Sequence, residues 1–106
     1  MLVFGEKYLA DLGEMVIELH YESASRITVT VVDGEGDVDS GRCETVAVAM
    51  SEVRPGLYFT TWQESSGTHV THLEDFANGV LRAVRRRPDG SAAVLTGTLR
   101  RGGVTM

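Results

Sequence analysis

Short runs of β-favouring residues, separated by turn residues, recur along the chain at intervals of about ten residues, a spacing typical of an all-β sandwich or barrel. The clearest run is 15–21, in which the odd positions are apolar and the even positions are mostly polar. Such a period of two gives a strand one apolar face. The run 26–32 is almost wholly β-branched and is therefore a poor helix. The pattern predicts eight strands, at 7–11, 15–21, 26–32, 43–52, 57–64, 68–76, 80–87 and 92–99.

Most of the predicted connections are only a few residues long, so consecutive strands are expected to be antiparallel neighbours. A flat eight-stranded meander would expose two bare edges, and closure into an up-and-down barrel removes them. Eight strands close around a space that side chains fill or that holds one small ligand. An open sandwich is the competing architecture. At 106 residues the chain is expected to form a single domain over 1–106.

The loop at 65–67 predicts which side chains share a face. Its glycine, Gly67, falls where a three-residue hairpin loop needs a positive φ. With that loop, Trp62 pairs with Val70 and Thr60 pairs with His72. One face then carries Tyr58, Thr60, Trp62, Glu64, Thr68, Val70, His72, Glu74 and Phe76. We expect this face to line the barrel lumen, because aromatic walls with a few convergent polar groups are typical of a ligand pocket.

The charge of the chain is negative overall but unevenly distributed. The formal net charge is −5, which disfavours nonspecific binding to nucleic acid. Residues 1–79 hold four basic residues against fourteen acidic ones, whereas residues 80–106 hold six arginines against Asp89. The cluster Arg85-Arg86-Arg87 is either a site for an anionic ligand or RNA, or the solvated face of an edge strand. The edge-strand interpretation is the simpler one, and no nucleic-acid partner is expected.

Signals for membranes and secretion are missing from the sequence. Its apolar runs are much shorter than the about 20 residues that a membrane helix needs. The N-terminal residues lack the basic flank and long apolar segment of a secretory signal. We therefore expect a cytoplasmic protein with no membrane partner. The lone Cys43 excludes an intrachain disulfide and is interpreted as a small apolar filler.

Neither loops nor clusters of polar residues favour a cofactor. Residues 33–41 faintly resemble a calcium loop but lack the bidentate glutamate, and their glycines lack the strand–helix context of a dinucleotide fingerprint. A metal site built on His72 and Glu74 would need a third ligand, either Glu64 or His20. The sequence has no His-x-His pair and no second cysteine. We expect no metal and no cofactor.

Three groups on the predicted lumen face are candidates for chemistry. Glu64 and His72 combine a carboxylate with an imidazole that would relay protons, and Tyr58 would donate to a developing oxyanion. Such a set suits decarboxylation, enolisation or cyclisation of a small organic acid. The structural alternative is that Glu64 lies near the barrel mouth and His72 satisfies a buried hydroxyl. Trp62 and Tyr58 would either stack on a flat ligand or plug the core.

Residues 54–80 carry the most specific motifs of the chain. They include Arg54-Pro55-Gly56, Trp62-Gln63-Glu64, Val70-Thr71-His72, Glu74-Asp75-Phe76 and Asn78-Gly79-Val80. In this stretch the chain resembles the MoaF-like family, which belongs to the calycin group of lipocalin-like barrels. The resemblance implies an eight-stranded barrel with a ligand cavity. Other barrels of the calycin group include fatty-acid and pigment binders and a few cofactor-independent enzymes, such as phenolic acid decarboxylases.

The lumen face and the resemblance lead to two main functional hypotheses. The first is noncatalytic binding of a small hydrophobic or aromatic ligand in the lumen, with a predicted site of Tyr58, Trp62, Glu64, His72 and Glu74. The alternative is a small cofactor-independent lyase, isomerase or cyclase that uses Glu64, His72 and Tyr58 as acid–base groups. A third hypothesis is an interaction module that uses the barrel exterior, or a homodimer formed through an exposed strand face.

Overall fold

The chain forms nine β-strands and no helix among the residues that the computed structural model describes, which are 2–34 and 41–102. The strands are β1 (Lys7–Asp11), β2 (Val16–Ser23), β3 (Arg26–Asp33), β4 (Cys43–Ala47), β5 (Ala49–Arg54), β6 (Leu57–Gln63), β7 (His69–Asp75), β8 (Val80–Arg86) and β9 (Ala92–Arg101). The all-β prediction is confirmed. The interpretation of the loop at 33–41 falls mostly on 35–40, outside the described residues.

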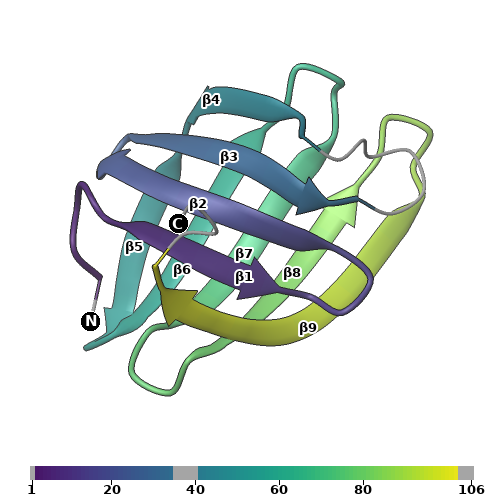
Figure 1. Cartoon of the computed structure of the whole chain (residues 1–106). Helices are drawn as coiled ribbons and strands as arrows, with labels where there is room; N and C mark the ends of the chain where they lie inside the picture. Colours follow the sequence, from purple (N-terminus) through teal and green to yellow (C-terminus); the bar gives the residue numbers. More distant parts are fainter. Residues whose placement is uncertain (1, 35–40, 103–106) are drawn as a thin grey trace.

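The strands form one antiparallel sheet that curls into a nearly closed barrel (Figure 1). Their order is β4-β3-β2-β1-β9-β8-β7-β6-β5, so the first and last strands of the chain are neighbours. The two ends of this order, β4 and β5, are consecutive segments separated only by Val48. The continuous chain through Val48 therefore joins the two edges of the sheet, and the barrel prediction is confirmed over the sandwich.

A single strand over 43–52 is predicted, whereas the structure has two strands that meet at Val48. The Val48 N–H donates to the carbonyl of Ser25 at 3.0 Å, outside the regular ladders. The segment before Val48 pairs with β3 and the segment after it pairs with β6. Val46 and Val48 are both buried while Ala47 is exposed, so the alternation of faces continues through the bend. This bend accounts for nine strands in place of the predicted eight.

The last strand is longer than expected. The predicted strand ends at residue 99, but β9 continues to Arg101 and pairs with Tyr8 and Leu9 of β1. Earlier in the same strand, Gly97 lies so close to β1 that a Cβ at this position would collide with the backbone of Asp11. Glycine is required there because it has no side chain, and its presence allows the first and last strands to close the wall.

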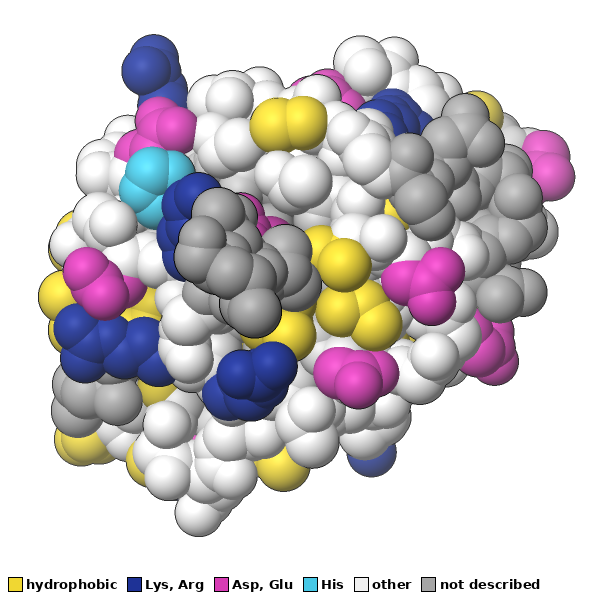
Figure 2. Space-filling model, in the orientation of Figure 1, with side chains coloured by type: hydrophobic (Ala, Val, Ile, Leu, Met, Phe, Trp, Pro, Cys, Tyr) yellow, Lys and Arg dark blue, Asp and Glu magenta, His cyan; other side chains and the backbone are white. Residues whose placement is uncertain are grey.

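The hydrophobic core fills the interior of the barrel. Its largest fully buried apolar side chains come from several strands: Tyr21, Leu19, Ile27, Leu81 and Val70. On the outside, the face of β1–β3 shows acidic and basic side chains interspersed around a small apolar group (Figure 2). Over 2–34 and 41–102, no helix has the length and apolar character needed to cross a membrane.

Candidate functional site

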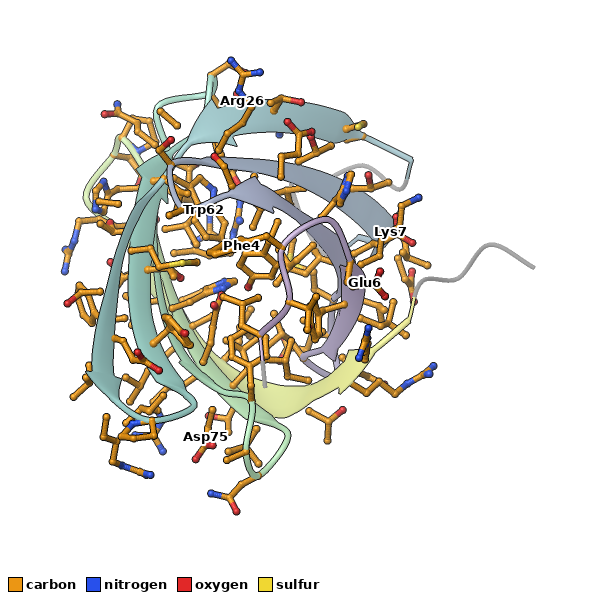
Figure 3. All side chains as sticks on the ribbon, turned by 90° about the vertical axis from the view of Figure 1, so that its left-hand side faces the viewer. Phe4, Glu6, Lys7, Arg26, Trp62 and Asp75 are labelled. Carbon is orange, nitrogen blue, oxygen red and sulfur yellow. The ribbon has the colours of Figure 1, made fainter. Side chains whose placement is uncertain are left out.

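The β6–β7 hairpin has the register that its loop predicts. Thr60 pairs with His72, and Gly67 has a φ of 91°. The predicted division into inner and outer faces is therefore confirmed: Trp62 and His72 are 3% and 1% exposed, whereas Phe59 is 45% exposed. Figure 3 shows Trp62 inside the ring of strands.

A cavity of about 20 Å³ lies in the lumen, where β6 ends and β7 begins. Trp62, Glu64 and His72, three of the predicted site residues, line it. Apolar side chains of β2, β3 and β4, among them Ile17 and Val29, form the facing wall. A volume of this size holds about one water molecule. We refer to this end of the barrel as the charged end, because its mouth carries Arg42, Glu44, Glu64 and Arg85.

A buried carboxylate orients the imidazole of His72. Glu74 Oε2 lies 2.8 Å from His72 Nδ1 and accepts a second hydrogen bond from Thr60 Oγ1 at 3.1 Å. With Glu74 ionised, its oxygens only accept, so Nδ1 would carry the proton and Nε2 would be the nitrogen left for binding or proton transfer. Trp62 packs edge-on against the imidazole, with ring centroids 4.7 Å apart. Glu74, a predicted ligand-binding residue, therefore lies behind His72 and outside the cavity lining.

Two ion pairs surround the mouth of the cavity. Arg85 donates from Nη1 and Nη2 to the two carboxylate oxygens of Glu64, at 3.2 and 3.0 Å, and both side chains are about nine-tenths buried. Arg42 Nη2 lies 3.5 Å from Glu44 Oε1. The other oxygen of Glu44 accepts from the backbone N–H of Ser65 at 2.7 Å. This bond connects β4 to the β6–β7 hairpin across a seam where no backbone ladder is formed between the described strands.

Three buried polar atoms lack a hydrogen-bond partner within 2–34 and 41–102: the Tyr21 hydroxyl, Trp62 Nε1 and Glu74 Oε1. Such atoms are uncommon in protein interiors and require an explanation. The Tyr21 hydroxyl lies near Glu74 without reaching ordinary hydrogen-bond geometry. Burial and, next, the Glu74 carboxylate raise the pKa of Tyr21 well above its usual range. Trp62 itself lines the cavity, and its N–H has no acceptor among the described residues.

Tyr58 lies at the other end of the lumen. It precedes Trp62 by four residues on β6, which places it about 13 Å away along the strand. Its ring packs against Phe76 with centroids 5.7 Å apart. Burial, followed by the charge and hydrogen bonding of Glu52, raises the pKa of Tyr58. The structure therefore does not bring Tyr58 together with the other two candidate acid–base residues.

The arginine cluster at 85–87 divides between the inside and the outside of the barrel. Because β8 pairs with β7 on one side and β9 on the other, the edge-strand interpretation is wrong. Leu81, Ala83 and Arg85 follow the period of two and face the lumen, whereas Arg86 is exposed. This alternation is the signal that identifies Arg85 as a site residue. When the three arginines are treated as one group, the inward orientation of Arg85 is overlooked.

The sequence reasoning also misses Arg42 and Glu44. Glu44 precedes the buried Val46 by two positions, so the same alternation places it on the inner face of β4. Cys43, between the two charged residues, faces the exterior and is exposed. Its interpretation as an apolar filler is therefore wrong, because the period of two directs Cys43 away from the core.

The described segments contain no group of three His, Cys, Asp or Glu side chains placed to hold a metal ion. Glu64, the third ligand that a site on His72 and Glu74 would need, is bound by Arg85 instead. The alternative third ligand, His20, lies on the outer face of β2 between two buried residues.

Comparisons with known proteins agree with this fold. A family model described as MoaF-like matches residues 4–100, far beyond the motifs at 54–80. No curated protein matches the chain. Among solved structures, it is similar to the crystal structure of a protein from Burkholderia vietnamiensis provisionally described as a beta-lactamase. The TM-score is 0.85 at 23% identity, over 93% of this chain and 94% of that one. At this identity the likeness shows the fold alone.

Proposed function

The chain belongs to the MoaF-like family, and on that basis we propose that it binds a small hydrophobic or aromatic molecule at the charged end of its barrel. The observation that carries this proposal is the cavity, which combines apolar walls with Trp62 and His72 in its lining and charged side chains at its mouth. Such a combination is typical of small-molecule sites. Trp62 would supply an aromatic surface for a flat ligand.

The cavity must widen before it accepts a molecule larger than water. Its volume of about 20 Å³ is far below the roughly 300–1,000 Å³ of pockets for drug-sized ligands. Arg85 and Glu64 lie among the lining residues and have long side chains, so a change of their rotamers would widen the opening without a movement of the backbone. The proposed ligand is therefore small, of the size of one aromatic ring with one polar substituent.

Fluorescence of Trp62, the only tryptophan, tests this proposal in titrations with benzyl alcohol, benzamide and benzoate. We expect at least one compound to change the emission saturably. Ala83→Val adds two methyl groups to the buried cavity wall and should weaken that binding by about tenfold or more. Ala92→Val, at an exposed position of β9, is the matched control and should leave the affinity unchanged. No saturable change with any compound, or equal affinity in the two valine variants, would contradict the proposal.

A second candidate function is catalysis without a cofactor, and the hydrogen bond between His72 and Glu74 favours it. A carboxylate that orients an imidazole is a common arrangement for a general base. His72 would exchange a proton with a small organic acid, as a lyase, isomerase or cyclase requires. Glu64 would take part only after leaving Arg85. Faster keto–enol exchange of phenylpyruvate with the unmodified protein than with the Ala83→Val variant would support this candidate.

We do not extend lactam hydrolysis from the structural neighbour to this chain. Serine enzymes of class A use a Ser-x-x-Lys motif, whereas the single lysine here, Lys7, follows Phe4 by three positions. A metal-dependent mechanism would need a ligand set that is not found in the described residues. The neighbour therefore supports the barrel and not a reaction.

A further inference from the structure

Resting on the function proposed above, we propose that the ligand carries a carboxylate, which replaces the Glu64 side chain on Arg85. Glu64 then acts as an internal substitute for the ligand: it occupies the guanidinium until the ligand enters and moves away when it does. Two separate observations lead to this proposal. One is the geometry of the Arg85–Glu64 pair, and the other is the N–H of Trp62 that has no acceptor.

Arg85 presents two parallel donors beside the cavity. Its Nη1 and Nη2 lie 3.2 and 3.0 Å from the two oxygens of Glu64, in the bidentate arrangement by which arginine recognises carboxylates. Glu64 follows the last residue of β6, and its backbone N–H donates to the Thr68 carbonyl at 2.9 Å. The side chain of Glu64 is therefore able to rotate out of the mouth while the hairpin keeps its shape.

Trp62 lines the same cavity and carries a second donor. Its Nε1 is buried, and no described residue accepts its hydrogen bond. An indole N–H only donates, so its missing hydrogen-bond partner must be an acceptor. Arg85 and Trp62 both line the cavity, and a carboxylate bound by Arg85 has further lone pairs for another donor. The lining residues thus carry one charged and one neutral donor, which we infer are both used by an anionic ligand.

When a ligand carboxylate replaces the Glu64 carboxylate on Arg85, the net charge at the mouth of the cavity stays the same. Removing one partner of a buried ion pair leaves an uncompensated charge, which is strongly unfavourable. A ligand carboxylate avoids this loss, because Arg85 keeps a bidentate anionic partner while Glu64 moves into water. A neutral amide cannot replace the charge. Arg42 is a poorer candidate for the exchange, because Glu44 is also held by the Ser65 backbone N–H.

The test compares benzoate with benzamide, which are similar in shape but differ in charge, and follows the Trp62 indole N–H by nitrogen-15 NMR. Benzoate should bind about tenfold or more tightly than benzamide and should move the indole proton downfield. Glu64→Gln should strengthen benzoate binding by about tenfold, because an amide competes less well for Arg85. Arg85→Gln should remove the preference for benzoate. Glu6→Gln, in the exposed pair with Arg101, is the matched control and should change neither affinity.

The outcomes separate this proposal from the function on which it rests. Equal binding of benzoate and benzamide, unchanged by Glu64→Gln, would overturn the carboxylate proposal and leave small-molecule binding standing. A preference for benzoate that survives Arg85→Gln would also overturn it. Binding of neither compound to any variant would remove both proposals. If the Arg85→Gln variant does not fold, Arg85→Lys takes its place. This variant keeps the positive charge but loses the two parallel donors of the guanidinium, so it must weaken benzoate binding.

Discussion

The two ends of the barrel are built from the same strands but filled with different side chains. At one end, here called the aromatic end, four rings pack together: Tyr8, Tyr21, Tyr58 and Phe76. Phe76 lies among them, with its ring centroid 5.0 Å from that of Tyr8, 5.8 Å from Tyr21 and 5.7 Å from Tyr58. At the charged end, the lumen holds a cavity with two ion pairs at its mouth.

This difference separates stability from binding within one small lumen. Edge-to-face aromatic pairs add packing energy beyond the area that they bury, so the aromatic end stabilises the fold. A buried ion pair contributes little net stability, but it keeps strong donors and acceptors beside a space that a ligand is able to enter. Inward-facing residues of β6 contribute to both stability and binding, because Tyr58 lies at one end of the strand and Trp62 at the other.

The largest effect is expected at the aromatic end. Phe76→Ala should lower the free energy of unfolding by about 3 kcal/mol, because it removes the ring that contacts three others and leaves a cavity. Phe59→Ala makes the same change on the outer face of β6, where the side chain is 45% exposed, and should cost less than about 1 kcal/mol. Urea denaturation measures both.

Ligand titration then shows whether the two ends are independent. Affinity for the best of the three aromatic compounds should change little in the Phe76→Ala variant, because distant sites are usually additive. Equal losses of stability in the two alanine variants, or a large loss of affinity in Phe76→Ala, would contradict the separation of the two ends.

A somewhat smaller effect on stability is expected at the charged end, where Glu64 and Arg85 form a pair. Glu64→Leu and Arg85→Met should each lower the free energy of unfolding by about 2–3 kcal/mol, because each leaves one buried charge without its partner. The double variant should lose less than either single variant. Urea denaturation of all four proteins gives the coupling energy. Additive losses would mean that the two residues do not act as a pair.

The faces of the β6–β7 hairpin could be predicted from the sequence, but the bend at Val48 could not. A hairpin register determines the orientation of every side chain on its two strands, so Gly67 and the alternation around it suffice to place Trp62 and His72 together. The alternation of buried and exposed residues continues through Val48, and the bend arises there because the chain changes partner from β3 to β6. A change of partner depends on distant strands and leaves no local pattern.

The candidate site could be predicted only in part, for a similar reason. Alternation indicates that Arg85 faces inward, but its contact with Glu64 joins residues 21 positions apart across the hairpins. Conversely, Tyr58 shares a face with Trp62 but not a cavity. A period of two identifies the face on which a side chain lies, and it does not give the depth in the lumen at which the side chain meets others.

The smallest effect concerns two turns, one at each end. At the aromatic end, Asp75 accepts hydrogen bonds from the side chain and backbone of Asn78 at 2.9 and 3.0 Å, and these hold its pKa below the ordinary 3.8. At the charged end, Asp89 accepts from the hydroxyl and backbone of Ser91 at 2.6 and 2.8 Å, which also lowers its pKa below 3.8. Each carboxylate therefore stabilises the fold above about pH 4 and loses that contribution as the pH falls through its folded-state pKa.

Melting temperatures of the Asp75→Asn and Asp89→Asn variants between pH 7 and pH 2 test this comparison. Both variants should melt below the unmodified protein at neutral pH, and both differences should shrink as the solution is acidified. The difference should be larger for Asp75→Asn, because Asp75 is 7% exposed and near Arg54, whereas Asp89 is exposed to solvent that screens its interactions. A difference that does not depend on pH would show that the amide disrupts the turn geometry and that the carboxylate charge is not the stabilising element.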